Sequence, residues 1–347
     1  MHELKITMLG ASGVGKTTLL TSMYEQFINS VINQGIELDL QPDILTSRIL
    51  QDKLIELKNL TSQFSVKGGI QGTEDDKIYK FRVGRKGEKP SLELKFCDYP
   101  GRYHTSENFD HHQFILKQLV DCVAVLLAID SPALMERDGH WHDQFNRPQQ
   151  IRDLFAEAYA GLDSPRLIIM APVRCEKYMQ TERSARDFVY RIKEKYSPLL
   201  NLFSSNSIDS NLAVVILPVQ TVGGVIFSRI EMYDEFPVFK FRKASPSSEY
   251  APKDSDQPLR YLMRFLLMLH LSQRKWKIPN EGISDNINDY IRTLFNIDFN
   301  INQIIDGIRQ VFKSDSHLTS AIDHYSQGCK SSGAFEIIQG HHLLDRY

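Results

Sequence analysis

A run of eight residues near the start of the chain combines the residue types and the spacing that bind a phosphate chain. The run is Gly10-Ala11-Ser12-Gly13-Val14-Gly15-Lys16-Thr17, which matches the pattern G-x-x-x-x-G-K-[ST]. Glycines let the backbone curl so that successive N–H groups point at phosphate oxygens, and a following helix adds the positive end of its dipole. We expect Lys16 to bridge the β- and γ-phosphates, the Thr17 hydroxyl to coordinate Mg²⁺, and Thr18 to join the nucleotide-binding set. We also expect the Lys16 side chain to be exposed to solvent when no nucleotide is bound. The alternative is a chance glycine-rich turn.

A second chemical signal is the run Phe96-Cys97-Asp98-Tyr99-Pro100-Gly101, which lies at the end of an apolar stretch. The Asp98 carboxylate in such a place can hold Mg²⁺ through a water molecule, and the Gly101 N–H can bond the γ-phosphate. Alone, this D-x-P-G motif is compatible with an ordinary aspartate-containing turn. In this order and at this distance from the phosphate loop, it predicts a nucleoside triphosphate site.

Short apolar runs alternate with helical patterns and predict the elements that must position these residues. Four runs that are apolar almost throughout predict central parallel strands covered on both faces: Leu4–Leu9, Cys122–Asp130, Leu167–Ala171 and Leu212–Val219. Lys77–Val83 mixes charged and apolar residues like an outer strand, and only a short Gly-rich segment separates it from Leu92–Phe96. These two strands should form an antiparallel hairpin. The pattern predicts a three-layer α/β fold with a mostly parallel sheet.

Composition shifts divide the chain into three predicted parts. Residues 1–243 form the nucleotide-binding domain, with a helical insertion at about 42–64 where leucines recur at helical spacing. Residues 244–258 are rich in Ser, Pro and Asp, which indicates a linker or a long surface loop. Residues 259–347 form a C-terminal helical extension, and the nearly all-apolar segment Leu259–Leu271 must pack into the protein or a partner.

Length and charge exclude several function classes. The 347 residues carry 41 Lys and Arg against 43 Asp and Glu, a net charge of −2 that gives no case for nucleic-acid binding. No apolar stretch reaches the ~18 residues of a membrane span. The cysteines are scattered, which predicts a reducing, cytoplasmic location without a disulfide framework or zinc cluster: Cys97, Cys122, Cys175 and Cys329.

The phosphate loop followed by D-x-P-G resembles the P-loop GTPases of the translation-factor-related (TRAFAC) class, over residues 1 to about 240. The layout is nearest to bacterial double-GTPase-type proteins. This resemblance implies a G-domain fold, GTP and GDP as ligands, Mg²⁺ as cofactor and slow GTP hydrolysis. Thr73 resembles the threonine that completes the Mg²⁺ shell when a γ-phosphate is present. Thr61, Ser62 or a role as an ordinary loop threonine remain alternatives.

The guanine-reading motif departs from the family pattern. Aligned on the end of the fifth predicted strand, Val173 replaces Asn, Arg174 replaces Lys and Glu176 replaces Asp. The Glu176 carboxylate could accept both guanine N–H groups while the Arg174 stem covers the base, or the two could form a surface ion pair. Gln220 and Thr221 occupy the last base-contacting loop, followed by a glycine pair that would let backbone N–H groups approach a purine oxygen. A plain turn explains that loop equally well.

Hydrolysis requires a held water and neutralised transition-state charge. We assign Lys16, Thr73 and Gly101 to the γ-phosphate. Arg102 occupies the position where the family carries a water-positioning residue, and His104 follows. Arg102 could stabilise charge or contact a partner, and His104 could orient water.

The resemblance implies a switch protein acting on a protein effector or a second GTPase, with dimerisation possible. The alternatives are a nucleotide-binding pseudo-GTPase scaffold, an ATP-using P-loop NTPase and, least favoured, a P-loop kinase.

Overall fold

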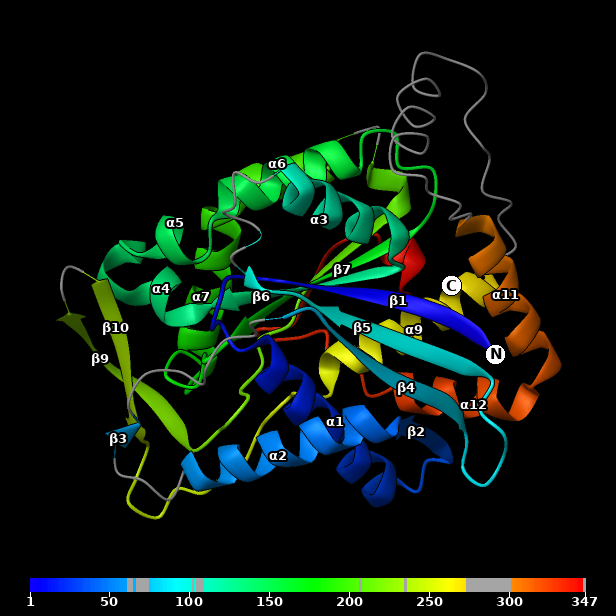
Figure 1. Ribbon diagram of the computed structural model, residues 1–347, viewed down its shortest axis with the longest axis horizontal. Helices are drawn as coiled ribbons and strands as arrows, with labels where there is room; N and C mark the ends of the chain where they lie inside the picture. The colour runs from blue at the N-terminus through cyan, green and yellow to red at the C-terminus, as the bar shows by residue number, and fades with distance from the viewer. Residues whose placement is uncertain are drawn as a thin grey trace.

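A mostly parallel sheet of eight strands runs through the molecule (Figure 1). The structure is a computed structural model, and it describes residues 1–60, 65–66, 75–101, 103, 109–205, 208–233, 236–272 and 301–345. The strand order is β11-β8-β7-β6-β1-β5-β4-β2. Strands β8, β7, β6, β1 and β5 are parallel to one another, whereas β4, β2 and β11 join antiparallel. The bounds are β1 His2–Leu9, β2 Leu38–Pro42, β4 Lys77–Arg85, β5 Leu92–Asp98, β6 Ala124–Asp130, β7 Arg166–Val173, β8 Leu212–Ile216 and β11 Glu336–Gln339.

The central strands are apolar on both faces because each face is covered by helices. Along β6, Leu126 enters one core while its neighbours Val125 and Leu127 enter the other, as the two-residue period of a strand requires. Helices α1, α9, α11 and α12 cover the first face, and α3, α6, α7 and α8 cover the second. The predicted three-layer α/β fold is therefore confirmed.

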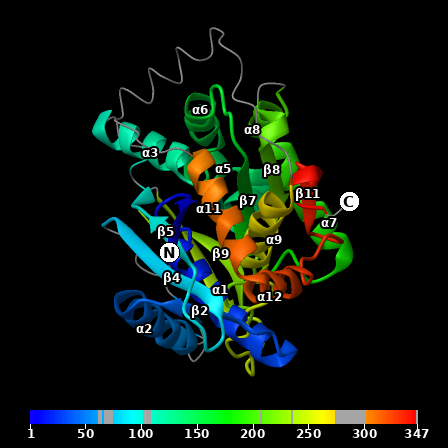
Figure 2. The same ribbon diagram turned by 90° about the vertical axis from the view of Figure 1, so that its right-hand side faces the viewer.

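The helices vary in length from about one turn to about five turns. Figure 2 shows that α9, α11 and α12 lie together on one face of the sheet. The predicted helical insertion forms α2, which packs on α1 and β4. The described helices are α1 Lys16–Gln34, α2 Ile44–Leu60, α3 Phe109–Asp121, α4 Ser131–Met135, α5 His142–Phe145, α6 Pro148–Ala158, α7 Glu182–Lys195, α8 Ser197–Phe203, α9 Gln257–Leu271, α11 Ile301–Ser314 and α12 Ser316–Ser326.

Two short strands extend the sheet beyond the predicted ones. The predicted hairpin forms as β4 and β5, but β2 pairs outside it, so β4 is not the edge. At the opposite edge β11 pairs with β8. Both added strands have five residues or fewer, which is too short for a clear alternating pattern.

A second sheet of three strands, in the order β3-β10-β9, was not predicted. Strands β9 (Val225–Tyr233) and β10 (Phe236–Lys243) form a hairpin, and β3 (Ser65–Val66) pairs with β10 at Phe241 and Arg242. Phenylalanines of the hairpin build a third apolar cluster with residues of α4, α5 and the end of α2: Phe227, Phe239 and Phe241 with Ala133, Phe145 and Leu60.

The segment between this hairpin and α9 is a long loop fastened to the rest of the chain. Gln26 of α1 accepts a hydrogen bond from the Ser255 N–H at 2.7 Å, and Ser30 donates to Asp256 at 2.8 Å. Beyond it, α9 and α11 share a core with the sheet. Division of the chain at residues 243 and 258 stays a prediction.

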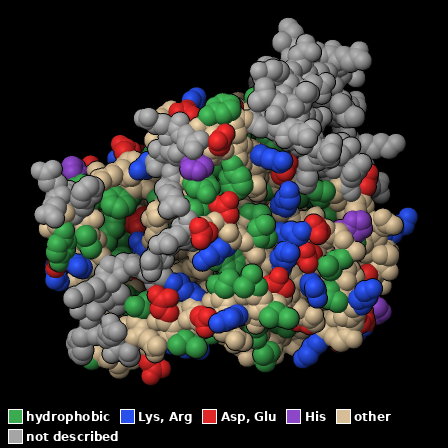
Figure 3. Space-filling view, in the orientation of Figure 1, with side chains coloured by type: hydrophobic (Ala, Val, Ile, Leu, Met, Phe, Trp, Pro, Cys, Tyr) green, Lys and Arg blue, Asp and Glu red, His purple; other side chains and the backbone are tan. Residues whose placement is uncertain are grey.

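The surface carries both charge signs. Figure 3 shows Lys and Arg side chains interspersed with Asp and Glu over the face presented, in accord with the net charge of −2. Across the described ranges, no helix combines the length and the apolar character needed to cross a bilayer.

Candidate functional site

The phosphate-loop residues connect β1 to α1, as the sequence predicts. Gly10 has φ +139° and Gly15, which precedes the first helical residue, has φ +112°, conformations that other residues rarely adopt. A Cβ atom at Gly10 would also lie 2.7 Å from the carbonyl oxygen of Ala128 on β6. The loop therefore needs glycine at both positions for its curl, and at Gly10 also for its close approach to the sheet.

Lys16 lies beneath this loop and is 5% exposed. Its Nζ donates to the carbonyl oxygen of Gly10 at 3.1 Å and lies 3.6 Å from Asp98 Oδ1. Burial lowers the pKa of Lys16, while the Asp98 carboxylate opposes that shift. The prediction that the Lys16 side chain is exposed to solvent when no nucleotide is bound is wrong. Its Nζ instead lies against the loop carbonyls and the Asp98 carboxylate.

Thr17 and Asp98 meet although they are distant in sequence. The Thr17 hydroxyl donates to Asp98 Oδ2 at 3.0 Å, and Asp98 is 1% exposed at the end of β5. A hydroxyl and a carboxylate are the hard oxygen ligands that Mg²⁺ prefers, so this pair fits the cofactor. Gly101 follows closely: a Cβ atom there would collide with the backbone nitrogen of Ser12. The D-x-P-G segment thus lies directly against the phosphate loop.

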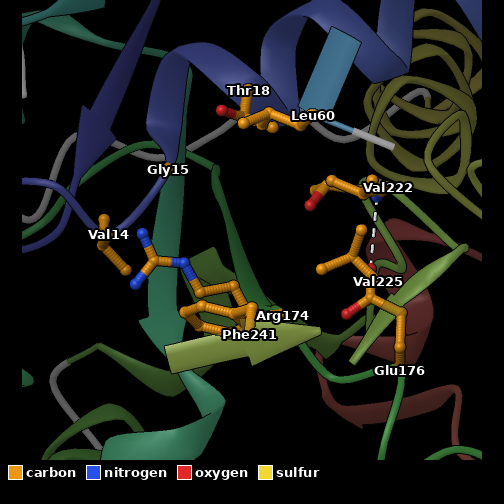
Figure 4. Close-up of a pocket in the computed structure, with 10 residues that line it drawn as sticks. Val14, Gly15, Thr18, Leu60, Arg174, Glu176, Val222, Val225 and Phe241 are labelled. Carbon is orange, nitrogen blue, oxygen red and sulfur yellow. Dashed lines mark hydrogen bonds between the residues drawn. The ribbon is translucent and has the colours of Figure 1, made fainter. Parts of the chain in front are cut away.

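A pocket opens beside the loop (Figure 4), and the empty space in and in front of it amounts to about 610 Å³. Its walls are mainly apolar, and its polar side chains are Thr18 from α1 and three from the predicted base-reading segments, Arg174, Glu176 and Thr221. The lining residues are Val14, Gly15, Thr18, Leu60, Arg174, Glu176, Thr221, Val222, Val225 and Phe241. Because Val14 and Gly15 belong to both, the pocket continues directly from the phosphate loop.

Arg174 is held by three groups at this junction. Its guanidinium donates to Asp130 Oδ2 at 2.7 Å and to the carbonyl oxygen of Gly13, and its Cζ lies 5.5 Å from the centroid of the Phe241 ring. The backbone of Arg174 is left-handed, with φ +58°. The alternative of a surface ion pair between Arg174 and Glu176 is wrong, because Arg174 pairs with Asp130 instead.

Glu176 is 6% exposed. Its Oε1 accepts the N–H groups of Val222 and Gly223, each at 3.2 Å. Burial raises the pKa of Glu176, although the two N–H groups and Arg174 favour its charged form. A buried carboxylate fixed through one oxygen can present the other to a ligand.

In the loop after β8, the N–H groups of the glycine pair are not available to a purine oxygen, contrary to the sequence interpretation. Gly223 is needed because a Cβ atom there would collide with the carbonyl oxygen of Ala251. The N–H of Gly223 is bonded to Glu176 and that of Gly224 to the Val222 carbonyl at 2.8 Å, so both are already used. Thr221 is buried and lines the pocket. Gln220 forms a β-bridge with Lys253.

The remaining predicted residues fall in different places. Ser12, Gly13 and Val14 line a second hollow with Asp130, on the side facing β10. Thr73, Arg102 and His104, together with the alternatives Thr61 and Ser62, lie outside the described residues. Their assignments stay predictions.

Sequence reasoning missed five residues that shape the site: Leu60, Asp130, Val222, Val225 and Phe241. Asp130 ends a buried parallel strand next to β1, a position where polar residues meet a ligand, so that signal was available. Phe241 lies in Phe-Lys-Phe-Arg, whose alternation is typical of a strand, but nothing local indicates where that strand packs.

No protein-family model matches this sequence, and no curated protein matches it. Solved structures do. The Ski7 GTPase-like domain of S. cerevisiae bound to GTP is 16% identical with TM-score 0.36, over 62% of this chain and 43% of that one. Translation elongation factor SelB of Methanococcus maripaludis with GppNHp is 11% identical with TM-score 0.33, over 64% of this chain and 30% of that one.

The cytosolic domain of the T. maritima FeoB iron transporter in a GDP form is 11% identical with TM-score 0.28, over 95% of this chain and 98% of that one. This chain thus spans less than half the length of the first two proteins. By its own sheet order and loop geometry, the chain has the three-layer α/β fold of a P-loop domain.

Proposed function

We propose that this chain binds GTP and GDP with Mg²⁺ and hydrolyses GTP slowly, as a switch that acts on a protein partner. The observation that carries the proposal is the continuity of the site. The loop with Lys16 and Thr17 faces Asp98 at one end, and the same loop opens at Val14 and Gly15 into the pocket with Glu176.

Each residue then has a defined task. Loop N–H groups and Lys16 would bind the phosphates, and the Gly101 N–H would reach the γ-phosphate. Thr17 would hold Mg²⁺ directly, Asp98 through a water and Thr73 when the triphosphate is bound. Bound Mg²⁺ supplies positive charge that offsets the charge on the phosphates. Arg102 and His104 are the proposed charge-stabilising and water-orienting residues.

The switch would involve the segments that carry Thr73 and Gly101. Contacts from both to a γ-phosphate would reposition the backbone around Thr73 and Gly101 and so alter a partner surface. The partner would be a protein effector or a second GTPase, and a second copy of this chain could supply the group that speeds hydrolysis.

One titration tests the nucleotide assignment. Purified protein is titrated with GTP, GDP, ATP and ADP, each with Mg²⁺ and with a chelator, and phosphate release is followed at saturating GTP. We expect guanine nucleotides to bind at least tenfold more tightly than adenine nucleotides, and GTP to need Mg²⁺. Equal competition by ATP and GTP would refute the guanine assignment. Tight GTP binding without phosphate release would make the protein a pseudo-GTPase scaffold.

A second candidate is an ATP-using P-loop NTPase, which one observation favours. Glu176 already accepts two backbone N–H groups through Oε1, so its carboxylate also serves to brace the loop after β8. If bracing is its only role, the pocket lacks a guanine-specific acceptor. The same titration separates the two candidates.

A further inference from the structure

The β9–β10 hairpin reaches the pocket at two apolar residues, Val225 and Phe241. Neither belongs to the phosphate loop, to D-x-P-G or to the base-reading segments. Phe241 is 9% exposed and lies under the Arg174 guanidinium. The hairpin therefore supplies part of the pocket wall.

The guanidinium of Arg174 is fixed at a definite place by charge and by this ring. Asp130 and the Gly13 carbonyl hold its N–H groups, and the Phe241 ring faces its carbon. A cation above an aromatic face is attracted by the ring quadrupole, and more strongly where water is excluded. Without the ring, the two polar contacts still hold the N–H groups, but the apolar side of the guanidinium has no support.

The opposite wall is also apolar. In Figure 4, Leu60 and Thr18 lie across the hollow from Arg174 and Phe241, and Glu176 lies at its far margin beside Val222 and Val225. A flat heteroaromatic ring with polar edges suits a slot with apolar or cationic faces and an acceptor at the edge.

We propose that Phe241 is a base-positioning residue: it holds the Arg174 guanidinium and, with Leu60, forms the faces between which a purine ring lies. This inference rests on the proposed nucleotide function and adds to it a residue on the β9–β10 hairpin. We expect phosphate binding by the loop to be nearly independent of Phe241, which does not belong to the loop.

The hairpin itself offers a matched control in Phe227. Phe227 is the strand partner of Phe241, the two rings are 6.1 Å apart, and Phe227 is 4% exposed in the same apolar cluster. It also lies under a cation, Lys177 Nζ at 4.9 Å, but it does not line the pocket. Truncation of either ring removes the same number of atoms from the same cluster.

The test compares Phe241→Leu, Phe241→Tyr and Phe227→Leu with the unaltered full chain. Dissociation constants are measured by titration for GDP, for ADP and for inorganic tripolyphosphate, which has no base. We expect Phe241→Leu to weaken the better-bound nucleotide by roughly three- to thirtyfold, as loss of a cation–π contact allows. Tripolyphosphate should change by less than about twofold in that variant. Phe241→Tyr, which keeps an aromatic ring, should bind nucleotide as tightly as the unaltered chain. Phe227→Leu should also leave nucleotide affinity unchanged.

The outcomes separate this inference from the proposed function. Binding by the unaltered chain tests the function: if ADP binds better than GDP, the guanine assignment fails, yet the Phe241 comparison still stands on ADP. If Phe241→Leu keeps full nucleotide affinity, or loses nucleotide and tripolyphosphate equally, Phe241 does not position the base. Equal losses in Phe241→Leu and Phe227→Leu would likewise overturn the inference, and a chain that binds no nucleotide overturns both proposals.

Discussion

The phosphate end and the base end of the site are built in different ways. The phosphate end comes from one run of sequence, residues 10–17, with one carboxylate from β5. The base end is assembled from α1, the end of α2, the segment after β7, the loop after β8 and the β9–β10 hairpin. The first is a local structure, whereas the second exists only when distant elements are packed.

The difference follows from the chemistry of the two ligand parts. Phosphate is bound by backbone N–H groups, and a backbone that curls this tightly needs glycine at fixed spacing. A base is bound by faces and edges that many side chains can supply. Substitutions at the phosphate end should therefore affect every nucleotide alike, and those at the base end should discriminate between bases.

The largest effect is expected from Lys16→Ala. Loss of the ammonium should weaken GTP, ATP and tripolyphosphate alike by about 100-fold or more, because it removes charge-assisted hydrogen bonds to two phosphates. Calorimetric titration of the three ligands measures this. Lys53→Ala, which removes an ion pair with Glu56 on α2 and no residue of the site, is the control.

Because Lys16 is buried, a melting curve of the variant must show that it folds. Undiminished affinity in a folded variant would contradict the phosphate role. A loss of affinity confined to GTP would mean that the phosphate end does not act on all nucleotides alike, contrary to the expected difference between the two ends.

A smaller and base-selective effect is expected from Glu176→Gln. The amide oxygen can still accept the N–H groups of Val222 and Gly223, so the loop keeps its brace. Its second position becomes an N–H₂ donor that faces the donors of guanine. GTP should weaken by about 10- to 100-fold and ATP by less than about threefold. Glu182→Gln, at an exposed position on α7, is the control. Equal losses for both nucleotides would mean that Glu176 does not read the base.

The smallest effect is a pH dependence confined to the base end. Burial raises the pKa of Glu176 above its ordinary value of 4.5, so its protonation begins at a higher pH than in an exposed glutamate. The protonated acid loses an acceptor for guanine. GDP affinity should therefore fall relative to ADP as the pH falls toward 4.5, by at most about tenfold per pH unit. The GDP/ADP affinity ratio measures this and cancels phosphate titration, and a flat ratio would count against the carboxylate as acceptor.

The parts of the fold and of the site that could be predicted from the sequence are the locally formed ones. Central strands such as β6 and β7 were predictable because they are apolar on both faces, and the loop was predictable because Gly10 to Thr17 is contiguous. Glu176 was located by alignment to a strand end. Its hydrogen bonds to Val222 and Gly223 were not predictable, because they join loops after different strands.

Phe241 illustrates the other limit. Its strand has an alternating pattern, yet the ring reaches the pocket only because β10 folds back toward α5 and the end of α2. Lys16 was predicted as a phosphate ligand, but its burial and its contacts with Gly10 and Asp98 were not predicted. The Nζ atom of Lys16 lies close to both Gly10 and Asp98 because β5, which ends at Asp98, pairs with β1.

The pairing of β11 with β8 has a consequence for how the chain is made. Until residues 336–339 are synthesised, β8 presents an unpaired apolar edge. At about 5–20 residues per second, a ribosome needs roughly 6 to 24 s to travel from residue 216 to residue 336. Unpaired edges attract other strands, so nascent chains are exposed to intermolecular aggregation throughout that interval. Chaperone supply during expression should therefore raise the yield of folded protein.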